Sequence, residues 1–220
     1  ALTCGFGMWF RVPNFAGPDE YSRLIQPMKV AGRVAADPGF ESLRAALLDG
    51  RALGATFYLF GFVLVPVFAV VLLTGRLGDF VALGGIESRW ELWHAAPAWF
   101  WSSSVLLGRL VTVALGVGCV YLTYRIGVEF RDRATGRLAA LFLSLSVGFV
   151  SQAHELGEDI PSLFFVLLTL LLAARYAHRG ERASFLAGAL TGGVAIAFKL
   201  SGGVAAIALG VAYLDRARRA

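Results

Sequence analysis

Residues 54–75 have the sequence GATFYLFGFVLVPVFAVVLLTG, a long apolar run that contains no charged residue. A helix needs about 20 apolar residues to cross the roughly 30 Å of hydrocarbon in a bilayer. The chain as a whole has the same character, since it is 57% hydrophobic, 16% charged and has a mean hydropathy of +0.68. Soluble domains carry about 25% charged residues. The composition therefore predicts an integral membrane protein.

Further apolar segments on either side of this run predict an all-α, polytopic transmembrane helix bundle in a single domain over residues 1–220. Several segments are shorter than 20 residues, and flanking side chains that reach the interface can complete such spans. We expect membrane helices at 54–75, 105–124, 138–153, 161–174, 184–198 and 202–214.

Both ends of the chain lie next to apolar runs. We interpret residues 1–12 as the end of a first membrane helix, with a signal-peptide remnant as the alternative for the first ten. The chain is then the N-terminal part of a longer protein, and we expect the fragment alone to be inactive.

The two longest connections, 13–53 and 76–104, have different compositions. The first is polar and helix-prone, and predicts short helices at 21–36 and 40–49. The helix at 21–36 either lies on the membrane surface by its apolar stripe or is an ordinary solvated helix. The second connection is rich in tryptophan, which concentrates at membrane interfaces, so we expect an interfacial loop. Stacking of a substrate on these rings is the alternative.

The distribution of arginine predicts the orientation in the membrane. The connections 125–137 and 175–182 and the C-terminal residues are arginine-rich, whereas 154–160 and 199–203 contain only Lys199 among lysine and arginine. Because basic loops stay in the cytoplasm, the latter two connections are predicted to face outside.

The same counting places Asp19 and Glu20 inside if residues 54–75 form one simple span. We prefer an arrangement in which 54–75 is re-entrant or oblique, with a bend favoured by Pro66. All the acidic residues considered below then face outside.

The first acidic pair, Asp19 and Glu20, follows Pro18 directly. Adjacent carboxylates suit a general base or a cation site. The alternative is a structural role, in which Asp19 caps a helix and Glu20 stabilises its first turn through the helix dipole.

The second acidic group lies in the segment 151–161, which contains His154, Glu155, Glu158 and Asp159 between two apolar runs. Ionisable residues beside membrane segments are often functional. The alternative is a solvated loop in which Asp159 caps the helix that starts near Pro161. A single histidine with carboxylates is only weak support for zinc.

Two basic residues, Arg109 and Lys199, are predicted near the same outer face. Cations in such a setting suit a phosphate or pyrophosphate ligand, and the alternative for each is a side chain that extends to the interface. The net charge of +5 does not indicate nucleic acid, because no basic surface interleaved with aromatic residues is present. Cys4 and Cys119 fit no metal spacing.

The order of these features resembles the membrane glycosyltransferases of the GT-C type, in the group of protein O-mannosyltransferases and aminoarabinose transferases. The resemblance covers roughly residues 15–203. It rests on the order of Pro18-Asp19-Glu20, Leu107-Gly108-Arg109-Leu110, Gly136-Arg137-Leu138, Phe149-Val150, His154…Glu158-Asp159-Ile160-Pro161 and Leu186…Ala197-Phe198-Lys199. The long segment 76–104 departs from the compact pattern of the family.

The resemblance implies transfer of a mannose-like hexose or related sugar from a polyprenyl-phosphate donor to a protein, lipid or glycan acceptor at the extracytoplasmic face of the cell membrane. It implies catalytic roles for Asp19, Glu20 and Asp159, with Asp19 as general base. Donor phosphate and substrate binding fall to Arg109, Lys199, His154 and Glu158.

No cofactor is implied with certainty, although a divalent cation held by Asp19, Glu20 and Asp159 is one alternative. A transporter or flippase with intramembrane charges is the second interpretation, and it predicts internal repeats that the sequence lacks. A non-catalytic membrane scaffold is the third, and it leaves the acidic residues unexplained.

Overall fold

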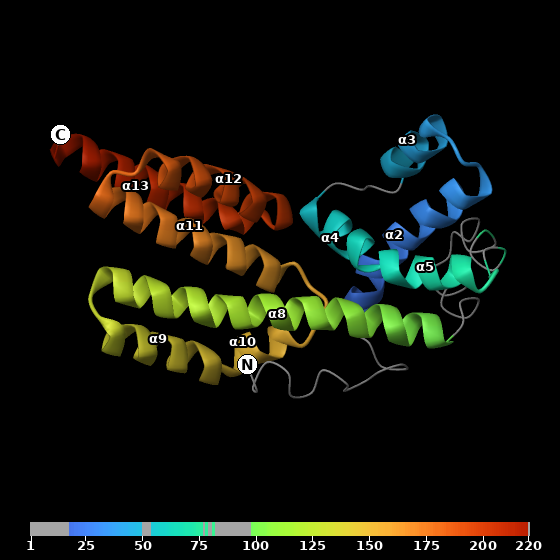
Figure 1. Cartoon of the computed structure of the whole chain (residues 1–220), viewed down its shortest axis with the longest axis horizontal. Coiled ribbons are helices and arrows are strands. Elements are labelled where there is room, and N and C mark those ends of the chain that lie inside the picture. The colour runs from blue at the N-terminus through green and yellow to red at the C-terminus, as the bar shows by residue number, and fades with distance from the viewer. Residues whose placement is uncertain (1–17, 50–53, 77, 79–80, 82–97, 220) are drawn as a thin grey trace. The chain divides into compact units, whose positions relative to one another are not determined.

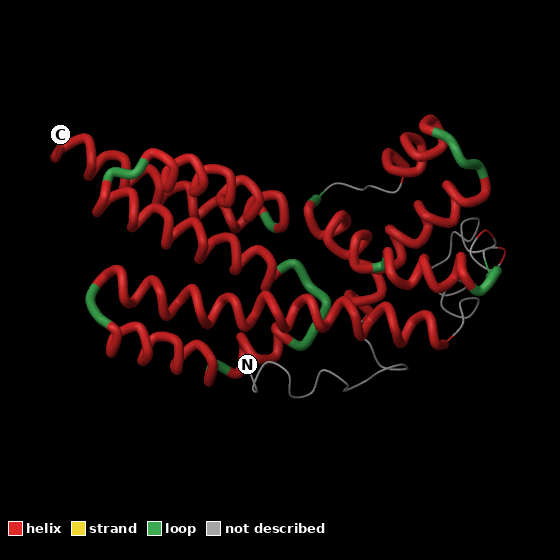
Figure 2. The backbone as a smooth tube through the Cα atoms, viewed as in Figure 1, coloured by secondary structure: helices red, strands yellow, loops and turns green. Residues whose placement is uncertain are grey.

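The computed structural model describes residues 18–49, 54–76, 78, 81 and 98–219, and this part of the chain contains helices and no strands (Figure 1). The chain divides into two compact units, Met8–Val111 and Thr112–Ala220. Helix α8, Ala98–Phe130, contributes to both. Short turns join most consecutive helices within each unit (Figure 2).

The N-terminal unit begins with α2, Pro18–Ala36, and α3, Phe40–Asp49. Proline is favoured at the first helical position, and Pro38 limits the helix that precedes it. The sequence predicts these helices at 21–36 and 40–49. Leu24 and Met28, from the apolar stripe of α2, are fully buried inside the protein. That face of α2 is therefore covered by protein.

Helices α4, Ala55–Val63, and α5, Val65–Leu73, together form one apolar helix of 19 residues that is long enough to cross a membrane. The chain breaks slightly at Leu64, whose N–H bonds the carbonyls of both Phe60 and Gly61. Pro66 lies in the first turn of α5, a position that tolerates proline. The bend expected near Pro66 is thus a local break. Re-entrance of 54–75 stays a prediction.

Helix α8 is much longer than the 105–124 expected for it, because the tryptophan-rich segment continues into its first turns. Phe100 and Trp101 are buried at 0% and 2% exposure, while Trp99 is partly exposed. Trp101 is therefore a core residue of the N-terminal unit and does not anchor an interfacial loop. Trp90 and Trp93 lie outside the described residues.

The C-terminal unit continues with α9, Arg133–Leu145, and α10, Val147–Ala153. The sequence predicts a single helix over 138–153, but α9 and α10 meet at an angle of 69°. Ser146 at the junction has an extended backbone and ends α9 by donating its N–H to Leu143. The apolar pattern continues across Ser146 and so does not reveal the break.

Three helices complete this unit: α11, Asp159–Arg179, α12, Arg182–Phe198, and, after a 3₁₀ turn at Leu200–Gly203, α13, Val204–Arg219. They lie side by side in Figure 1, and α11 packs against both others. Gly180 turns the chain between α11 and α12 with φ of 70°, a left-handed conformation that suits glycine. A hydrogen bond of 2.8 Å joins the Thr169 and Thr191 hydroxyls inside the α11–α12 contact.

The predicted fold class is confirmed, since the described chain is helical and four of its helices, or five with the bent pair, could cross a membrane. Helices α8, α9 and α11 begin before the apolar segments predicted for them, whereas α4 and α5 lie within the predicted 54–75. Backbone hydrogen bonding continues into the polar ends, where arginine is a good helix former. Apolar runs therefore do not mark the full length of these helices.

The turn between α8 and α9 depends on Asp132, whose carboxylate accepts a hydrogen bond of 2.7 Å from the Thr135 N–H. This backbone hydrogen bond is the main reason that the pKa of Asp132 is lowered below its ordinary value. A lowered pKa in the folded state means that the stabilisation is present at neutral pH. It is lost as pH falls through the folded-state pKa.

We predict that Asp132→Asn keeps the cap, because asparagine caps helices about as well as aspartate, but removes its acid sensitivity. The wild type should lose more stability than Asp132→Asn when pH is lowered from neutral to below the ordinary aspartate value. Thermal unfolding in detergent across this range measures the difference. Identical pH dependence of the two proteins would contradict the role of Asp132.

Candidate functional site

Asp159 and Lys199 form an ion pair, although they lie 40 residues apart in the sequence. Asp159 is the first residue of α11, and Lys199 directly follows the last residue of α12. Because the Gly180 turn makes these helices antiparallel, the start of α11 meets the end of α12. The Lys199 Nζ lies 2.5 Å from the Asp159 Oδ1, and the side chains are 42% and 47% exposed. The pair is therefore accessible at one end of the unit.

Each charge of the pair lies at the end of a helix that favours it. Asp159 is in the first turn of α11, where the helix dipole is positive, and Lys199 follows α12, where the dipole is negative. The helix ends thus stabilise the two charges independently of the ion pair. Either charge is therefore still stabilised by its helix end if the ion pair opens.

The backbone beneath the pair is held by the carbonyl of Ala195, which is fully buried. It accepts hydrogen bonds from the Ser162 hydroxyl at 3.2 Å and from the Lys199 N–H at 3.1 Å. Ser162 belongs to α11, so one carbonyl connects both helices to Lys199. Gly202 packs on the same carbonyl so closely that a Cβ there would lie 2.5 Å from the oxygen. The Lys199 backbone is therefore fixed while its side chain extends outward.

The connection between α10 and α11 brings the other predicted residues of segment 151–161 close to the pair in sequence. His154 ends α10 and Glu158 precedes α11, and both are half-buried. Glu155 is exposed, whereas Leu156 is buried at 2% and anchors the connection. His154 and Glu158 each take part in further interactions. The end of the unit that holds the pair is thus polar and rich in carboxylates.

The remaining predicted site residues belong to the N-terminal unit. Arg109 lies on α8 and is only 4% exposed, with further interactions of its own. Helix α2 begins at Pro18, so Asp19 and Glu20 both lie in its first turn, and Asp19 is not the N-cap that the structural alternative expected. Their side chains are outside those that the structure describes. The structure therefore brings Asp159 and Lys199 together, and a joint site with Asp19 stays a prediction.

In the described part of the chain, no group of three or more histidine, cysteine, aspartate or glutamate side chains could hold a metal ion. The carboxylates proposed for a cation include Asp19 and Glu20, whose side chains are not described. A divalent cation therefore stays a hypothesis.

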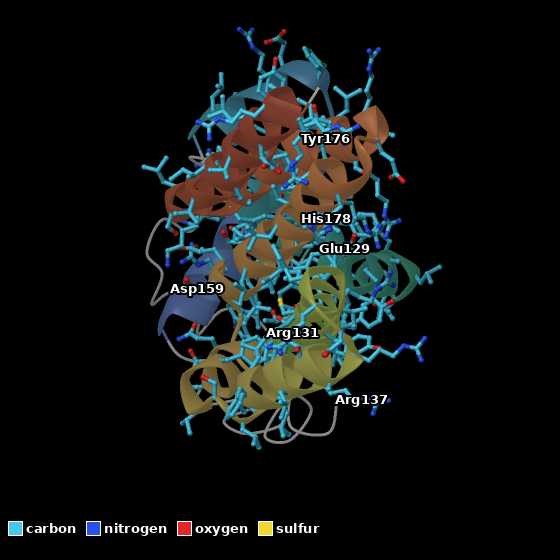
Figure 3. All side chains as sticks on the ribbon, turned by 90° about the vertical axis from the view of Figure 1, so that its left-hand side faces the viewer. Glu129, Arg131, Arg137, Asp159, Tyr176 and His178 are labelled. Carbon is cyan, nitrogen blue, oxygen red and sulfur yellow. The ribbon has the colours of Figure 1, made fainter. Side chains whose placement is uncertain are left out.

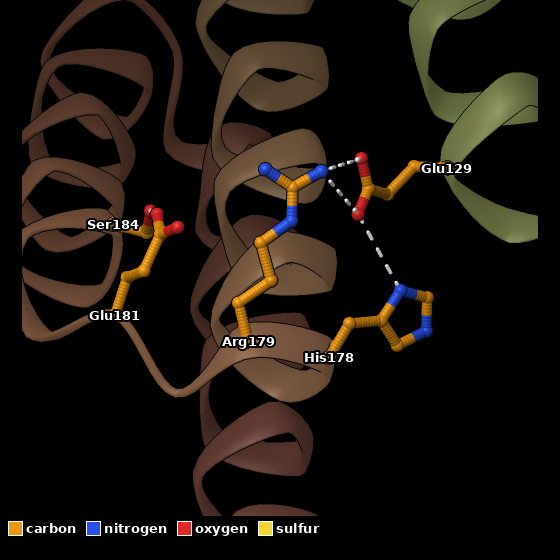
Figure 4. Close-up of polar contacts among 5 residues, drawn as sticks. All are labelled: Glu129, His178, Arg179, Glu181 and Ser184. Carbon is orange, nitrogen blue, oxygen red and sulfur yellow. Dashed lines mark hydrogen bonds and ion pairs between the residues drawn. The ribbon is translucent and has the colours of Figure 1, made fainter.

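A second polar cluster, which the sequence interpretation missed, lies at the opposite end of α11 (Figure 4). Glu129 from α8 is 12% exposed, and its carboxylate accepts hydrogen bonds of 3.1 and 3.3 Å from one Arg179 nitrogen. The His178 Nδ1 lies 3.5 Å from the same carboxylate. Glu129 and His178 are neighbours on adjacent helices (Figure 3). This cluster joins α8 to α11.

The signal for this cluster was present in the sequence but ambiguous. Glu129 lies within the arginine-rich connection 125–137, three residues before Asp132. Spacing along one helix does not reveal which distant helix supplies the partner. The contact is therefore interpreted best as a structural ion pair at the end of the bundle.

A groove of about 510 Å³ lies along α12 and α13, and it is lined almost entirely by apolar groups. Five of its nine lining residues are glycine or alanine, and another, Ile196, precedes Lys199 by three residues. Its lining residues are Phe185, Ala189, Gly192, Gly193, Ile196, Ala206, Leu209, Gly210 and Tyr213.

Helices long and apolar enough for a membrane, with paired charges at their ends, define a multi-pass membrane protein. A model of the dolichyl-phosphate-mannose-protein mannosyltransferase family matches residues 99–219, which is more than half of the chain. The chain therefore belongs to this family. No curated protein and no solved structure matches it significantly.

Family membership confirms the resemblance predicted from the sequence and makes the chain a membrane glycosyltransferase of the mannosyltransferase type. The match includes the ion pair of Asp159 and Lys199, the connection before α11, and Arg109. Asp19 and Glu20 lie before its first residue.

We predict that Gly202→Ala destabilises the site by roughly 1–3 kcal/mol, as overpacking of a well-packed interior does. The new methyl group must displace the Ala195 carbonyl that positions Lys199. Gly203→Ala is the matched control, because its Cβ meets only Ile196 at an ordinary 3.9 Å. Thermal unfolding in detergent should separate the two variants, and equal stability would contradict the close contact at Gly202.

Proposed function

We propose that the protein transfers a mannose-like hexose from a polyprenyl-phosphate donor to an acceptor at the outer face of the cell membrane. The observation that carries this proposal is the accessible pair of Asp159 and Lys199, at adjoining helix ends within the region that matches the family. Transfer from a sugar phosphate needs both a carboxylate and a cation near the reacting groups. The chain is then a glycosyltransferase of the GT-C type.

The outer location is supported by the charges at the two ends of the C-terminal unit. Asp159 and Lys199 occupy one end of α11 and α12, while Arg179 and Arg182 occupy the other. The 21 residues of α11 separate these ends by about 30 Å, the thickness of the hydrocarbon layer. Because basic ends stay in the cytoplasm, the ion pair faces outside.

The reaction assigns a separate task to each charge. An acceptor oxygen attacks C1 of the sugar, the bond from C1 to the phosphate oxygen breaks, and the phosphate leaves with the electron pair. A carboxylate takes the acceptor proton, and a cation stabilises the growing phosphate charge. Asp19 is the proposed base, with Glu20 and Asp159 in support.

Binding of the donor phosphate falls to Lys199 and Arg109 in this proposal. His154 and Glu158 contribute to substrate binding from the connection that precedes α11. The apolar groove on α12 and α13 suits a hydrocarbon chain, since it is lined by apolar groups and comes close to Lys199 in sequence. The acceptor is a protein, a lipid or a glycan, and a divalent cation is compatible with the carboxylates.

We predict that Asp19→Asn lowers mannosyl transfer by about 10²- to 10⁴-fold, the usual contribution of a general base. Asp159→Asn should also lower transfer. The assay follows radiolabelled mannose from a polyprenyl-phosphate donor to acceptors in membranes that contain the variant protein.

Asp215→Asn is the matched control for Asp159→Asn, since it removes another partly exposed ion pair, with Arg219, on α13. It should transfer mannose at the wild-type rate. Wild-type rates for both Asp19→Asn and Asp159→Asn would overturn the proposed function.

A further inference from the structure

The ion pair presents a conflict that the proposed function alone does not resolve. Lys199 is assigned to the donor phosphate and Asp159 to the catalytic carboxylates, yet the two charges bind each other. The Asp159 Oδ1 that accepts a hydrogen bond from the Lys199 ammonium group is not open at the same time to an acceptor hydroxyl or a cation. The two residues therefore do their separate work fully only after the pair opens.

We propose that Lys199 exchanges partners during the reaction, leaving Asp159 for the phosphate of the lipid donor. This inference rests on the proposed function and adds the order of events to it. Arrival of the phosphate draws Lys199 away from the carboxylate, so Asp159 is released to a greater extent when a donor is bound.

The free energies permit the exchange. A partly exposed ion pair contributes only about 0.2–1 kcal/mol, so opening this pair requires little. Each partner also keeps the helix end that favours its charge. The pair is therefore strong enough to form at rest and weak enough to yield to a competing anion.

The geometry permits the exchange as well. The Lys199 backbone is fixed, because its N–H bonds the Ala195 carbonyl and its own carbonyl accepts a hydrogen bond of 2.8 Å from Gly202. Its side chain is a compact charge on a flexible four-carbon stem and is 42% exposed. The ammonium group can thus move while the helix ends stay in place.

The charge of the ligand gives the exchange a direction. A sugar phosphodiester carries one negative charge, whereas the phosphate monoester that leaves carries about −1.5 to −2 at neutral pH. The attraction for Lys199 therefore grows as the bond to the sugar breaks. Asp159 is released most completely at the stage when Asp19 takes the acceptor proton and Asp159 is needed in support.

Binding of farnesyl phosphate and of uncharged farnesol to the full chain in detergent tests this proposal without sugar transfer. We expect the wild type to prefer the phosphate. Asp159→Asn removes the competing carboxylate and should bind farnesyl phosphate roughly two- to five-fold more tightly, as the strength of an exposed ion pair implies. Binding of farnesol should not change.

Further variants separate the exchange from simpler effects. Lys199→Met should lose the preference for phosphate, and Lys199→Arg should retain it because the charge remains. In the Lys199→Met background, Asp159→Asn should give no gain, whereas simple repulsion between Asp159 and the phosphate would give the gain in both backgrounds. Asp215→Asn should bind like the wild type.

The outcomes distinguish the inference from the proposed function. If the wild type prefers farnesyl phosphate but Asp159→Asn brings no gain, or brings it without Lys199, the exchange is overturned and the phosphate site stands. If the wild type does not prefer farnesyl phosphate to farnesol, the phosphate site fails and the exchange fails with it.

Discussion

The hydrocarbon interior of a membrane offers no hydrogen-bond partner, so every backbone polar group there must be paired within the protein. Helices meet this requirement. Charged side chains are costly in the same interior, so they are placed at lowest cost at the helix ends. The α11–α12 pair follows this rule, with Asp159 and Lys199 at one end and the Glu129, His178 and Arg179 cluster at the other. The chemistry of this family is therefore expected at the helix ends.

Within this arrangement, small residues position the reactive groups. The Gly180 turn makes α11 and α12 antiparallel, and Gly202 allows the chain after α12 to lie against the Ala195 carbonyl. That carbonyl binds Ser162 of α11 and the backbone of Lys199. A charged side chain is thus presented on a rigid support within the region that matches the family. The weak ion pair with Asp159 then serves as a resting state that a phosphate can open.

Composition and apolar runs were sufficient to predict the helical fold class, because a helix that crosses a membrane needs a long run of apolar residues. They were not sufficient for features that depend on three-dimensional contacts. The break at Ser146 leaves the apolar pattern intact, and the burial of Trp101 depends on which helices surround it. Asp159 and Lys199 were both identified as candidates, but their pairing across 40 residues follows from the antiparallel packing of α11 and α12. Glu129 was missed because its partners lie on a distant helix.

The central claim is that the two acidic pairs work at one outer face, and cysteine labelling tests it most directly. Single cysteines at Gly17, beside Asp19, and at the exposed Glu155 would be introduced without Cys4 and Cys119, with Arg182→Cys as the inner reference. In intact cells, a membrane-impermeant maleimide should label positions 17 and 155 and should reach position 182 only after permeabilisation. Labelling of 17 and 155 from opposite sides would contradict a shared site, because Asp19 would then lie on the other side of the membrane from Asp159 and Lys199.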